Sequence, residues 1–114
     1  MNKRIVFRNM DHSDPIEAHA HQQLEKIVTF LENEPDPVTI DVYLEPSKVH
    51  SHHRVELRIK SPNYSRTSSY EGSEFYKVLD RVIDVMYHLL REDKEKRHDK
   101  LKQVGRHDEF KKQR

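Results

Sequence analysis

Two eight-residue segments in the middle of the chain alternate strictly between apolar and polar side chains. The apolar positions are Val38, Ile40, Val42 and Leu44 in the first segment and Val55, Leu57 and Ile59 in the second. Because successive side chains of a strand point to opposite faces of a sheet, residues 38–45 and 53–60 are predicted strands with one buried face. A sheet of this kind needs a second layer to cover its apolar face.

Two further strands are predicted, one near each end of this region. Residues 3–8 place Ile5 and Phe7 on one face, and residues 64–71 form a weakly apolar segment that is rich in Ser and Thr. Such a composition is typical of a partly exposed edge strand. The pattern leaves open which face of the sheet carries Arg66 and Tyr70.

The covering layer is predicted to be two helices. The first begins with Asp14 as N-cap, Pro15 at the first helical position and Glu17 at the capping-box position, and it ends before Pro35 and Pro37. Its apolar stripe, at spacings of three and four, comprises Ile16, Ala20, Leu24, Ile27, Val28 and Leu31.

The second helix follows Gly72, with Ser73 as its predicted cap. Its apolar stripe comprises Phe75, Leu79, Val82, Ile83, Met86, Leu89 and Leu90. Beyond Leu90 the chain is mostly charged, and its large apolar residues are Leu101, Val104 and Phe110. The prediction is an α+β fold of order βαβββα, with two helices packed on one face of a four-stranded sheet. Residues 1–93 form the domain, and residues 94–114 form a basic extension that is either a helix end or a disordered tail.

The composition excludes several classes of protein. The chain has no Cys, which removes disulfides, thiolate metal sites and cysteine nucleophiles and favours the reducing cytosol. No apolar run approaches the roughly 20 residues that span a bilayer, and no apolar signal segment follows Met1. We therefore expect a soluble, cytoplasmic protein without a membrane partner.

The net charge of +1 hides an asymmetry along the chain. Residues 1–90 hold 11 Lys and Arg against 14 Asp and Glu, a net charge of −3, whereas residues 91–114 hold 10 against 6, a net charge of +4. A basic end on an acidic body favours a polyanionic partner, because Lys and Arg near phosphates release condensed counterions. A solvated helix end accounts for the same charges equally well.

Metal binding and catalysis find little support in the sequence. The nine histidines include two clusters, His12/His19/His21 and His50/His52/His53. His19 and His21 are two residues apart and point to different sides of a helix, whereas helical metal ligands usually stand three or four apart. The second cluster lies around a turn, where only His50 and His52 could share a face of an extended strand. The two glycines, Gly72 and Gly105, form no phosphate-binding loop, and Ser65, Ser68 and Ser69 have no evident activating partner. We therefore expect that the protein is not an enzyme and that it binds no metal, no cofactor and no small-molecule substrate.

Nucleic-acid binding is the remaining class. The open face of the sheet should carry Arg4, Arg8, Arg54, Arg58, Lys60 and Tyr43, although Asp41, Glu45 and Glu56 share that face. A second basic group follows the later helix: Lys77, Arg81, Arg91, Lys94, Lys96, Arg97, Lys100 and Lys102. Arginine pairs with phosphates and stacks on bases, and tyrosine can also stack. Taken singly, each of these charged residues is more typical of a solvated surface, and only the combined pattern favours nucleic-acid binding.

The passage from Tyr70 through Glu71-Gly72-Ser73-Glu74-Phe75-Tyr76-Lys77 to Asp84 resembles the ribosome hibernation-promoting factor / ribosome-associated inhibitor A family, also described as sigma-54 modulation proteins. Leu24-Glu25-Lys26-Ile27 is similar to a segment of that family's first helix. The resemblance covers about residues 3–100 and corresponds to the short forms, which lack a dimerisation domain.

The resemblance implies a βαβββα fold that binds the small ribosomal subunit and its rRNA between head and body, over the mRNA and tRNA sites. Translation would be blocked by steric occlusion during stress or stationary phase, and the ribosome preserved. Lys26, Lys94 and Lys96 match basic positions of the family, whereas Gln23, Val85, His88 and Glu92 depart from them. The predicted rRNA-binding residues are Lys26, Arg54, Arg58, Lys60, Lys77, Arg81, Arg91, Lys94, Lys96 and Arg97.

Two alternatives remain open at this point. One is a general module for double-stranded RNA, and the other is a protein-interaction module that pairs through its open sheet or edge strand. The sequence leaves undetermined the oligomeric state and whether ribosomes are paired into dimers or only silenced.

Overall fold

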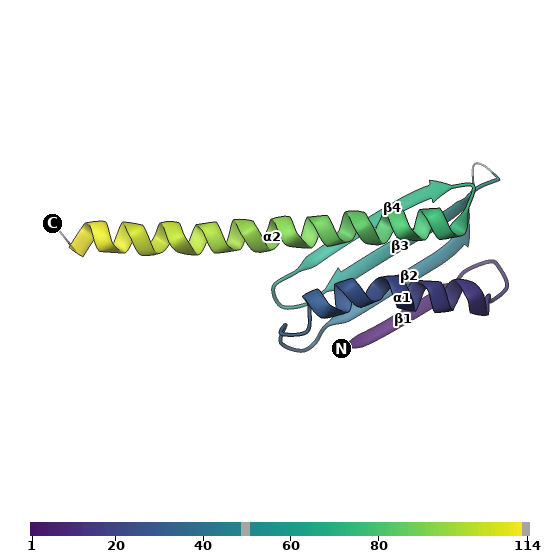
Figure 1. Ribbon diagram of the computed structural model, residues 1–114, viewed down its shortest axis with the longest axis horizontal. Coiled ribbons are helices and arrows are strands. Elements are labelled where there is room, and N and C mark those ends of the chain that lie inside the picture. Colours follow the sequence, from purple (N-terminus) through teal and green to yellow (C-terminus); the bar gives the residue numbers. More distant parts are fainter. Residues whose placement is uncertain (49–50, 113–114) are drawn as a thin grey trace.

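The computed structural model describes the backbone of residues 1–48 and 51–112 and the side chains of residues 1–48 and 51–100. Its elements follow the order β1 (Asn2–Phe7), α1 (Asp14–Phe30), β2 (Thr39–Pro46), β3 (His53–Lys60), β4 (Ser65–Gly72) and α2 (Phe75–Lys112). The predicted βαβββα order is therefore confirmed (Figure 1). The predicted bounds of β3 match, and those of β1, β2 and β4 are wrong by one residue.

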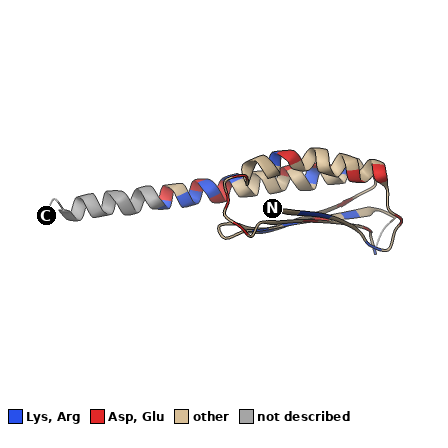
Figure 2. Cartoon of the chain, turned by 90° about the horizontal axis from the view of Figure 1, so that it is seen from below, with Lys and Arg blue, Asp and Glu red and all other residues tan. Residues whose placement is uncertain are grey.

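The four strands form one sheet in the order β1-β2-β3-β4. β1 runs parallel to β2, and the other neighbours are antiparallel. Both helices lie on the same face, and the opposite face is uncovered (Figure 2). The α+β arrangement predicted from the two periodicities is confirmed.

The hydrophobic core lies between the sheet and the two helices. Its fully buried side chains come from the alternating strands and from both helical stripes: Leu24, Ile27, Leu31, Ile40, Val42, Leu44, Leu57, Ile59, Leu79, Ile83, Met86 and Leu90. The register also settles the faces of β4, because cross-strand partners share a face. Arg66 pairs with Ile59 and Tyr70 pairs with Val55, so both side chains of β4 lie on the helix side.

The start of α1 differs from the prediction by one residue. Ser13, not Asp14, is the N-cap, and its hydroxyl accepts a hydrogen bond of 3.4 Å from the backbone N–H of Ile16. Pro15 is consequently the second helical residue. Glu17 lies one position beyond the capping box, where its carboxylate contacts His12 and His21 instead. Ser13 therefore satisfies a backbone N–H group at the start of the helix, and Glu17 pairs with histidines instead of with the backbone.

The second helix is the longest element, and its C-terminal part extends past the sheet (Figure 1). Among the described side chains of α2, Leu90 is the last that is buried. The molecule is therefore elongated, with extents of 66 × 27 × 18 Å. Residues 98–112 account for roughly 22 Å of helix, at 1.5 Å per residue. The predicted side chains Leu101, Lys102, Val104 and Phe110, like His50, lie outside the described residues.

No helix in the described part of the chain is both long and apolar enough to cross a membrane.

Candidate nucleic-acid interface

The ten predicted rRNA-binding residues do not form one surface. Three lie on the open sheet face (Arg54, Arg58, Lys60), two near the start of α2 (Lys77, Arg81), and the rest where α2 leaves the body (Lys26, Arg91, Lys94, Lys96, Arg97). The contacts that each group makes differ, and they decide which cations remain available to a phosphate.

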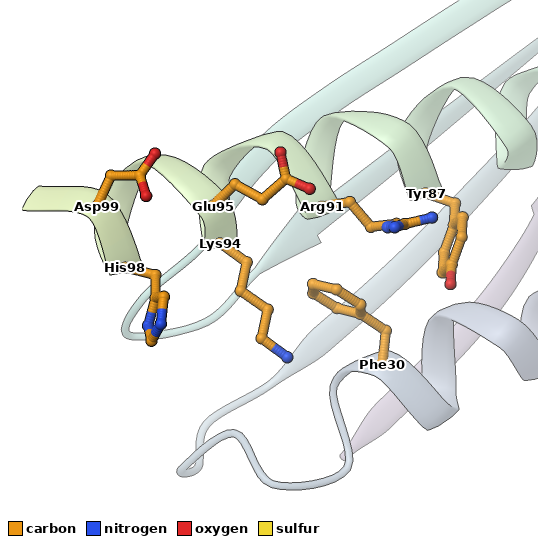
Figure 3. A pocket seen from close by; sticks show the side chains of 7 residues that line it. All are labelled: Phe30, Tyr87, Arg91, Lys94, Glu95, His98 and Asp99. Carbon is orange, nitrogen blue, oxygen red and sulfur yellow. The ribbon is translucent and has the colours of Figure 1, made fainter. Parts of the chain in front are cut away.

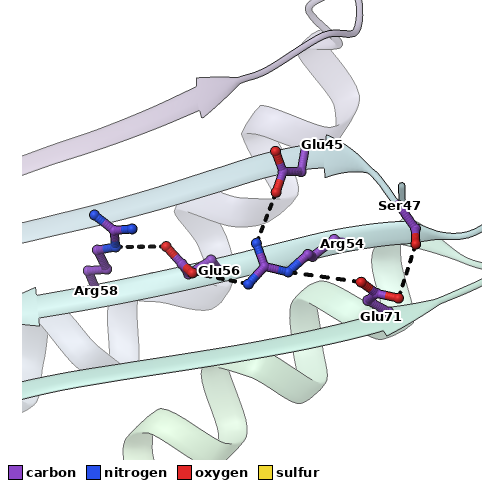
Figure 4. Close-up of polar contacts among 6 residues, drawn as sticks. All are labelled: Glu45, Ser47, Arg54, Glu56, Arg58 and Glu71. Atoms are coloured by element: carbon purple, nitrogen blue, oxygen red, sulfur yellow. Dashed lines mark hydrogen bonds and ion pairs between the residues drawn. The ribbon is translucent and has the colours of Figure 1, made fainter. Parts of the chain in front are cut away.

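On the open sheet face, Arg54 is surrounded by carboxylates. Its guanidinium contacts Glu45 at 2.9 Å, Glu56 at 3.2 Å and Glu71 at 4.0 Å (Figure 4). The hydrogen bond to Glu45 is the largest cause that raises the pKa of Arg54. Glu56 also accepts a hydrogen bond of 2.7 Å from Arg58. Contacts with carboxylates of the same protein therefore already occupy these guanidinium groups, and the surrounding carboxylates repel a polyanion.

Tyr43 lies on the same face but is only 7% exposed. Arg8 covers its ring at 3.9 Å from the centroid, with Arg58 at 5.0 Å and Arg4 at 6.0 Å. Arg4 also donates a hydrogen bond of 3.1 Å to the Tyr43 hydroxyl. Since this ring is already covered by cations, Tyr43 is a packing residue and offers no free surface for a base.

Between the helices, basic and acidic groups are interleaved. Lys26, Lys77 and Arg81 line one hollow together with Asp80 and Asp84. Lys26 donates a hydrogen bond of 2.6 Å to Asp84, and this bond is the largest cause that lowers the pKa of Asp84. Lys77 pairs with Glu74 at 2.9 Å.

Where α2 leaves the body, three aromatic rings form a cluster. Phe30 at the end of α1 contacts Tyr64 at 5.6 Å and Tyr87 on α2 at 6.1 Å between centroids, both edge to face. This geometry is favourable because the positive edge of one ring meets the negative face of the other. Tyr64 is buried, whereas Phe30 and Tyr87 are half-buried.

Four of the predicted cations surround these rings. Lys26 and Arg91 lie 5.6 and 5.8 Å from the Tyr87 centroid, Lys94 lies 5.5 Å from that of Phe30, and Arg97 lies 5.1 Å from that of Tyr64. All four distances lie within the range of a cation–π interaction. We call these seven residues the junction cluster.

A cleft of about 700 Å³ opens at the junction cluster. Its walls include Phe30 and Tyr87, and the cations Arg91 and Lys94 (Figure 3). Tyr87, Arg91, Lys94 and His98 follow at spacings of four, three and four, which places them on one side of α2. Glu95 and Asp99 also border the cleft, but their carboxylates point away from Phe30.

Two contacts fix the direction of α2 at this point. Arg66 on β4 donates hydrogen bonds of 2.8 and 2.7 Å to the carboxylate of Asp93. Arg97 donates one of 3.2 Å to the Tyr64 hydroxyl. The pKa of that hydroxyl is raised by burial, so it remains protonated at neutral pH. The cleft is therefore lined by elements whose relative position is held by side-chain contacts.

Among the described residues, one group of side chains has the geometry of a metal site: His12, Asp14 and Glu17 at the start of α1. Their contacts with one another already pair them, since His12 contacts Glu17 through Nε2 and Asp14 through Nδ1, the latter at 3.2 Å. His19 is not part of this group; its Nε2 lies 2.7 Å from Asp80 on α2.

The junction cluster joins predicted cations to three aromatic residues that the sequence patterns did not single out: Phe30, Tyr64 and Tyr87. The spacing of Tyr87, Arg91, Lys94 and His98 was a signal that could have revealed one side of it. Nothing in the sequence placed Phe30 or Tyr64 beside that stripe. The arrangement can bind phosphates through its cations and stack planar groups on its rings.

Known proteins share both the sequence pattern and the fold of this chain. The family model for the sigma 54 modulation protein / S30EA ribosomal protein matches residues 4–98. A search of curated proteins gave no match. Similar solved structures include the N-terminal domain of Protein Y from Thermus thermophilus (TM-score 0.67, 18% identity, 81% of this chain and 98% of that one). A ribosomal subunit interface protein from Coxiella burnetii is also similar (TM-score 0.66, 16% identity, 82% of this chain and 98% of that one).

Proposed function

Because the chain belongs to the sigma 54 modulation protein / S30EA ribosomal protein family, we propose that it binds the ribosome and holds it inactive in translation. The binding site proposed is the small subunit between head and body, over the mRNA and tRNA sites. Such a protein acts in the cytoplasm, during stress or stationary phase, and needs neither a cofactor nor a substrate.

The observation that carries the proposal is the junction cluster. Arg91 and Lys94 line one cleft, and Lys26 and Arg97 lie against the aromatic rings of the same cluster. Several cations within reach of one strand of rRNA release several counterions, which provides most of the affinity for a polyanion. The sheet face contributes less, since Arg54 and Arg58 already contact Glu45 and Glu56.

The mechanism proposed is occupation of space. The core is fully buried and α2 extends the body to 66 Å, so the protein presents a long, preformed surface. Inhibition then requires no chemical step, because a bound body excludes mRNA and tRNA from the same volume. The exposed Lys96 beside the junction cluster would add a further phosphate contact.

Of the family positions that lack a basic residue, Gln23 is half-buried on α1, and the other three are exposed on α2. Val85, His88 and Glu92 present one apolar, one titratable and one acidic side chain. We propose that Arg81 and Arg91, also exposed on α2, supply the missing charge. With this assignment, α2 can bind a polyanion although its basic residues stand at positions that differ from those of the family.

Sedimentation of the purified protein with ribosomes tests the proposal. In sucrose gradients at low salt we expect the protein to move with small subunits and whole ribosomes and to leave them as the salt concentration rises. Nuclease treatment should release it. A translation assay in the same buffer should show inhibition that mRNA competes away, because both occupy one site.

Three results would contradict the proposal. Failure to sediment with ribosomes at low salt would remove its basis. Equal affinity for free duplex RNA and ribosomes would indicate the general RNA-binding alternative. Sedimentation that survives nuclease and is insensitive to salt would indicate a protein-interaction module.

A further inference from the structure

We propose that the cleft of the junction cluster holds one unpaired nucleobase, stacked against Phe30 or Tyr87, with an adjacent phosphate bound by Arg91 and Lys94. This inference rests on the proposed function only in taking RNA as the partner. It goes further in assigning a preference: the surface recognises single-stranded, looped or bulged RNA and discriminates against uninterrupted duplex.

The first support is the accessibility of the rings. Phe30 and Tyr87 are half-buried and form part of the cleft wall (Figure 3). They meet at an interplanar angle of 79°. One ring can therefore contact the face of a planar group while the other contacts its edge. Tyr43, in contrast, is covered by arginines.

The second support is the size of the cleft. Its volume of about 700 Å³ lies within the roughly 300–1,000 Å³ typical of pockets for small-molecule ligands. A nucleobase that has left its stack fits such a site, whereas a base inside a duplex does not reach it. In duplex RNA both faces of a base are covered by its neighbours, and only phosphates and groove edges are exposed.

The third support is the position of the charges. The Lys94 ammonium lies 5.5 Å from the Phe30 centroid, and the Arg91 guanidinium lies 5.8 Å from that of Tyr87. Each ring therefore has a cation beside it. When a base stacks on the ring, this flexible side chain can move off the ring face and pair with the phosphate of the same nucleotide. Arginine can also stack on the free face of a base.

Two acidic groups at the rim reduce the positive charge of the cleft. Glu95 and Asp99 border the cleft on the side of α2 that faces away from Phe30 (Figure 3). A second hollow, lined by Tyr70, Lys77 and Arg81, also has two acidic residues in its wall, Glu71 and Glu74. It offers one aromatic ring instead of two and provides a matched control.

The test compares a duplex RNA hairpin with the same hairpin carrying a single-nucleotide bulge, in which the bulged base is the fluorescent analogue 2-aminopurine. The wild-type protein should bind the bulged hairpin more tightly and quench its fluorescence. Tyr87→Leu and Phe30→Leu should each weaken binding of the bulged RNA roughly 5- to 150-fold, the range for removal of one stacked base, and leave duplex binding unchanged. Lys94→Gln should weaken both RNAs.

Controls separate stacking from folding. Tyr87→Phe keeps a ring of the same shape and should retain the preference for the bulge. Tyr70→Leu should leave both affinities unchanged. Circular dichroism and thermal unfolding of each variant identify any weakening that comes from misfolding, and Phe30→Leu keeps the test valid if Tyr87→Leu is unstable.

Equal affinity of the wild type for both hairpins, or a bulge preference that survives both leucine substitutions, would overturn this inference. Sedimentation of the wild type with ribosomes is measured in parallel. Ribosome binding without a bulge preference contradicts the cleft inference alone. A bulge preference without ribosome binding supports the cleft and contradicts the proposed function.

Discussion

Arg66 on the edge strand β4 holds the carboxylate of Asp93 on α2 through two hydrogen bonds of 2.8 and 2.7 Å. The pair joins the sheet to the helix beyond Leu90, the last buried side chain in the described part of α2. Planar guanidinium and carboxylate groups match in this geometry, so the contact fixes orientation as well as distance. The direction in which α2 leaves the body therefore depends on a polar contact, where the hydrophobic core has ended.

The first prediction concerns how the stability of the protein falls at acid pH. Arg66 hydrogen bonding is the largest cause that lowers the pKa of Asp93 in the folded protein. A carboxyl group with a lowered folded pKa contributes its full stability above its unfolded pKa of about 3.9 and loses it as the pH falls through the folded value. Asp93→Asn should therefore unfold more easily than the wild type at pH 7, and the difference should shrink below about pH 4.

Urea unfolding at pH 7, 5, 4 and 3 measures this difference. Asp99→Asn, which removes an exposed carboxylate from the same helix, is the matched control and should leave the stability close to wild type at each pH. A gap between wild type and Asp93→Asn that stays constant down to pH 3 would contradict the assignment.

The second prediction concerns the turn between β4 and α2. A Cβ atom added at Gly72 would lie 2.7 Å from the Cγ2 of Val78, which is buried against the core. Gly72→Ala should destabilise the protein by about 1–3 kcal/mol, the usual cost of overpacking. Gly72→Ala combined with Val78→Ala should recover part of this stability. Urea unfolding of both variants checks the prediction, and a wild-type midpoint for Gly72→Ala would refute it.

The third prediction concerns the sheet face. Arg54→Met would leave Glu45, Glu56 and Glu71 without their common cation. Breaking a fully buried pair costs about 3–5 kcal/mol, and partial exposure of Arg54 should reduce the cost to about 1–2 kcal/mol. Adding Glu56→Gln should restore part of the stability by removing one of the carboxylates. If thermal unfolding shows Arg54→Met to be as stable as the wild type, the network does not stabilise the sheet.

The fourth prediction concerns charge at the junction. Reversal of Lys94, Lys96 and Arg97 together should weaken ribosome binding and make it less dependent on salt, by roughly 0.7–0.9 in logarithmic slope for each phosphate that the variant no longer neutralises. Lys60→Glu on the sheet face is the control and should have the smaller effect. Salt titrations of co-sedimentation measure both. Unchanged sedimentation of the triple variant would argue strongly against the proposed binding surface.

Sequence periodicity was sufficient to predict the architecture. Alternation in β2 and β3, and spacings of three and four in α1 and α2, define which side chains each element buries, and the core contains these residues. Local capping was less predictable. Ser13 and Asp14 are adjacent and similarly favoured as caps, so the local sequence alone did not distinguish them.

The candidate site was predictable only in part. Arg91, Lys94 and Arg97 were identified from charge, but their aromatic partners Phe30 and Tyr64 were not. Arg54 was predicted from the sequence to bind rRNA, and Glu45 and Glu71 are distant from it along the chain. In the sheet these three residues lie in one row across β2, β3 and β4.

The sequence by itself determined the order of strands and helices, the apolar face of each and the basic character of the C-terminal part. Those properties arise within single elements, from the periods of the backbone and the charges of the side chains. Only the tertiary structure decided which cations meet carboxylates and which meet aromatic rings. That choice depends on strand register and on how α1 packs beside α2, because neighbours across two elements are set by the packing of the whole core.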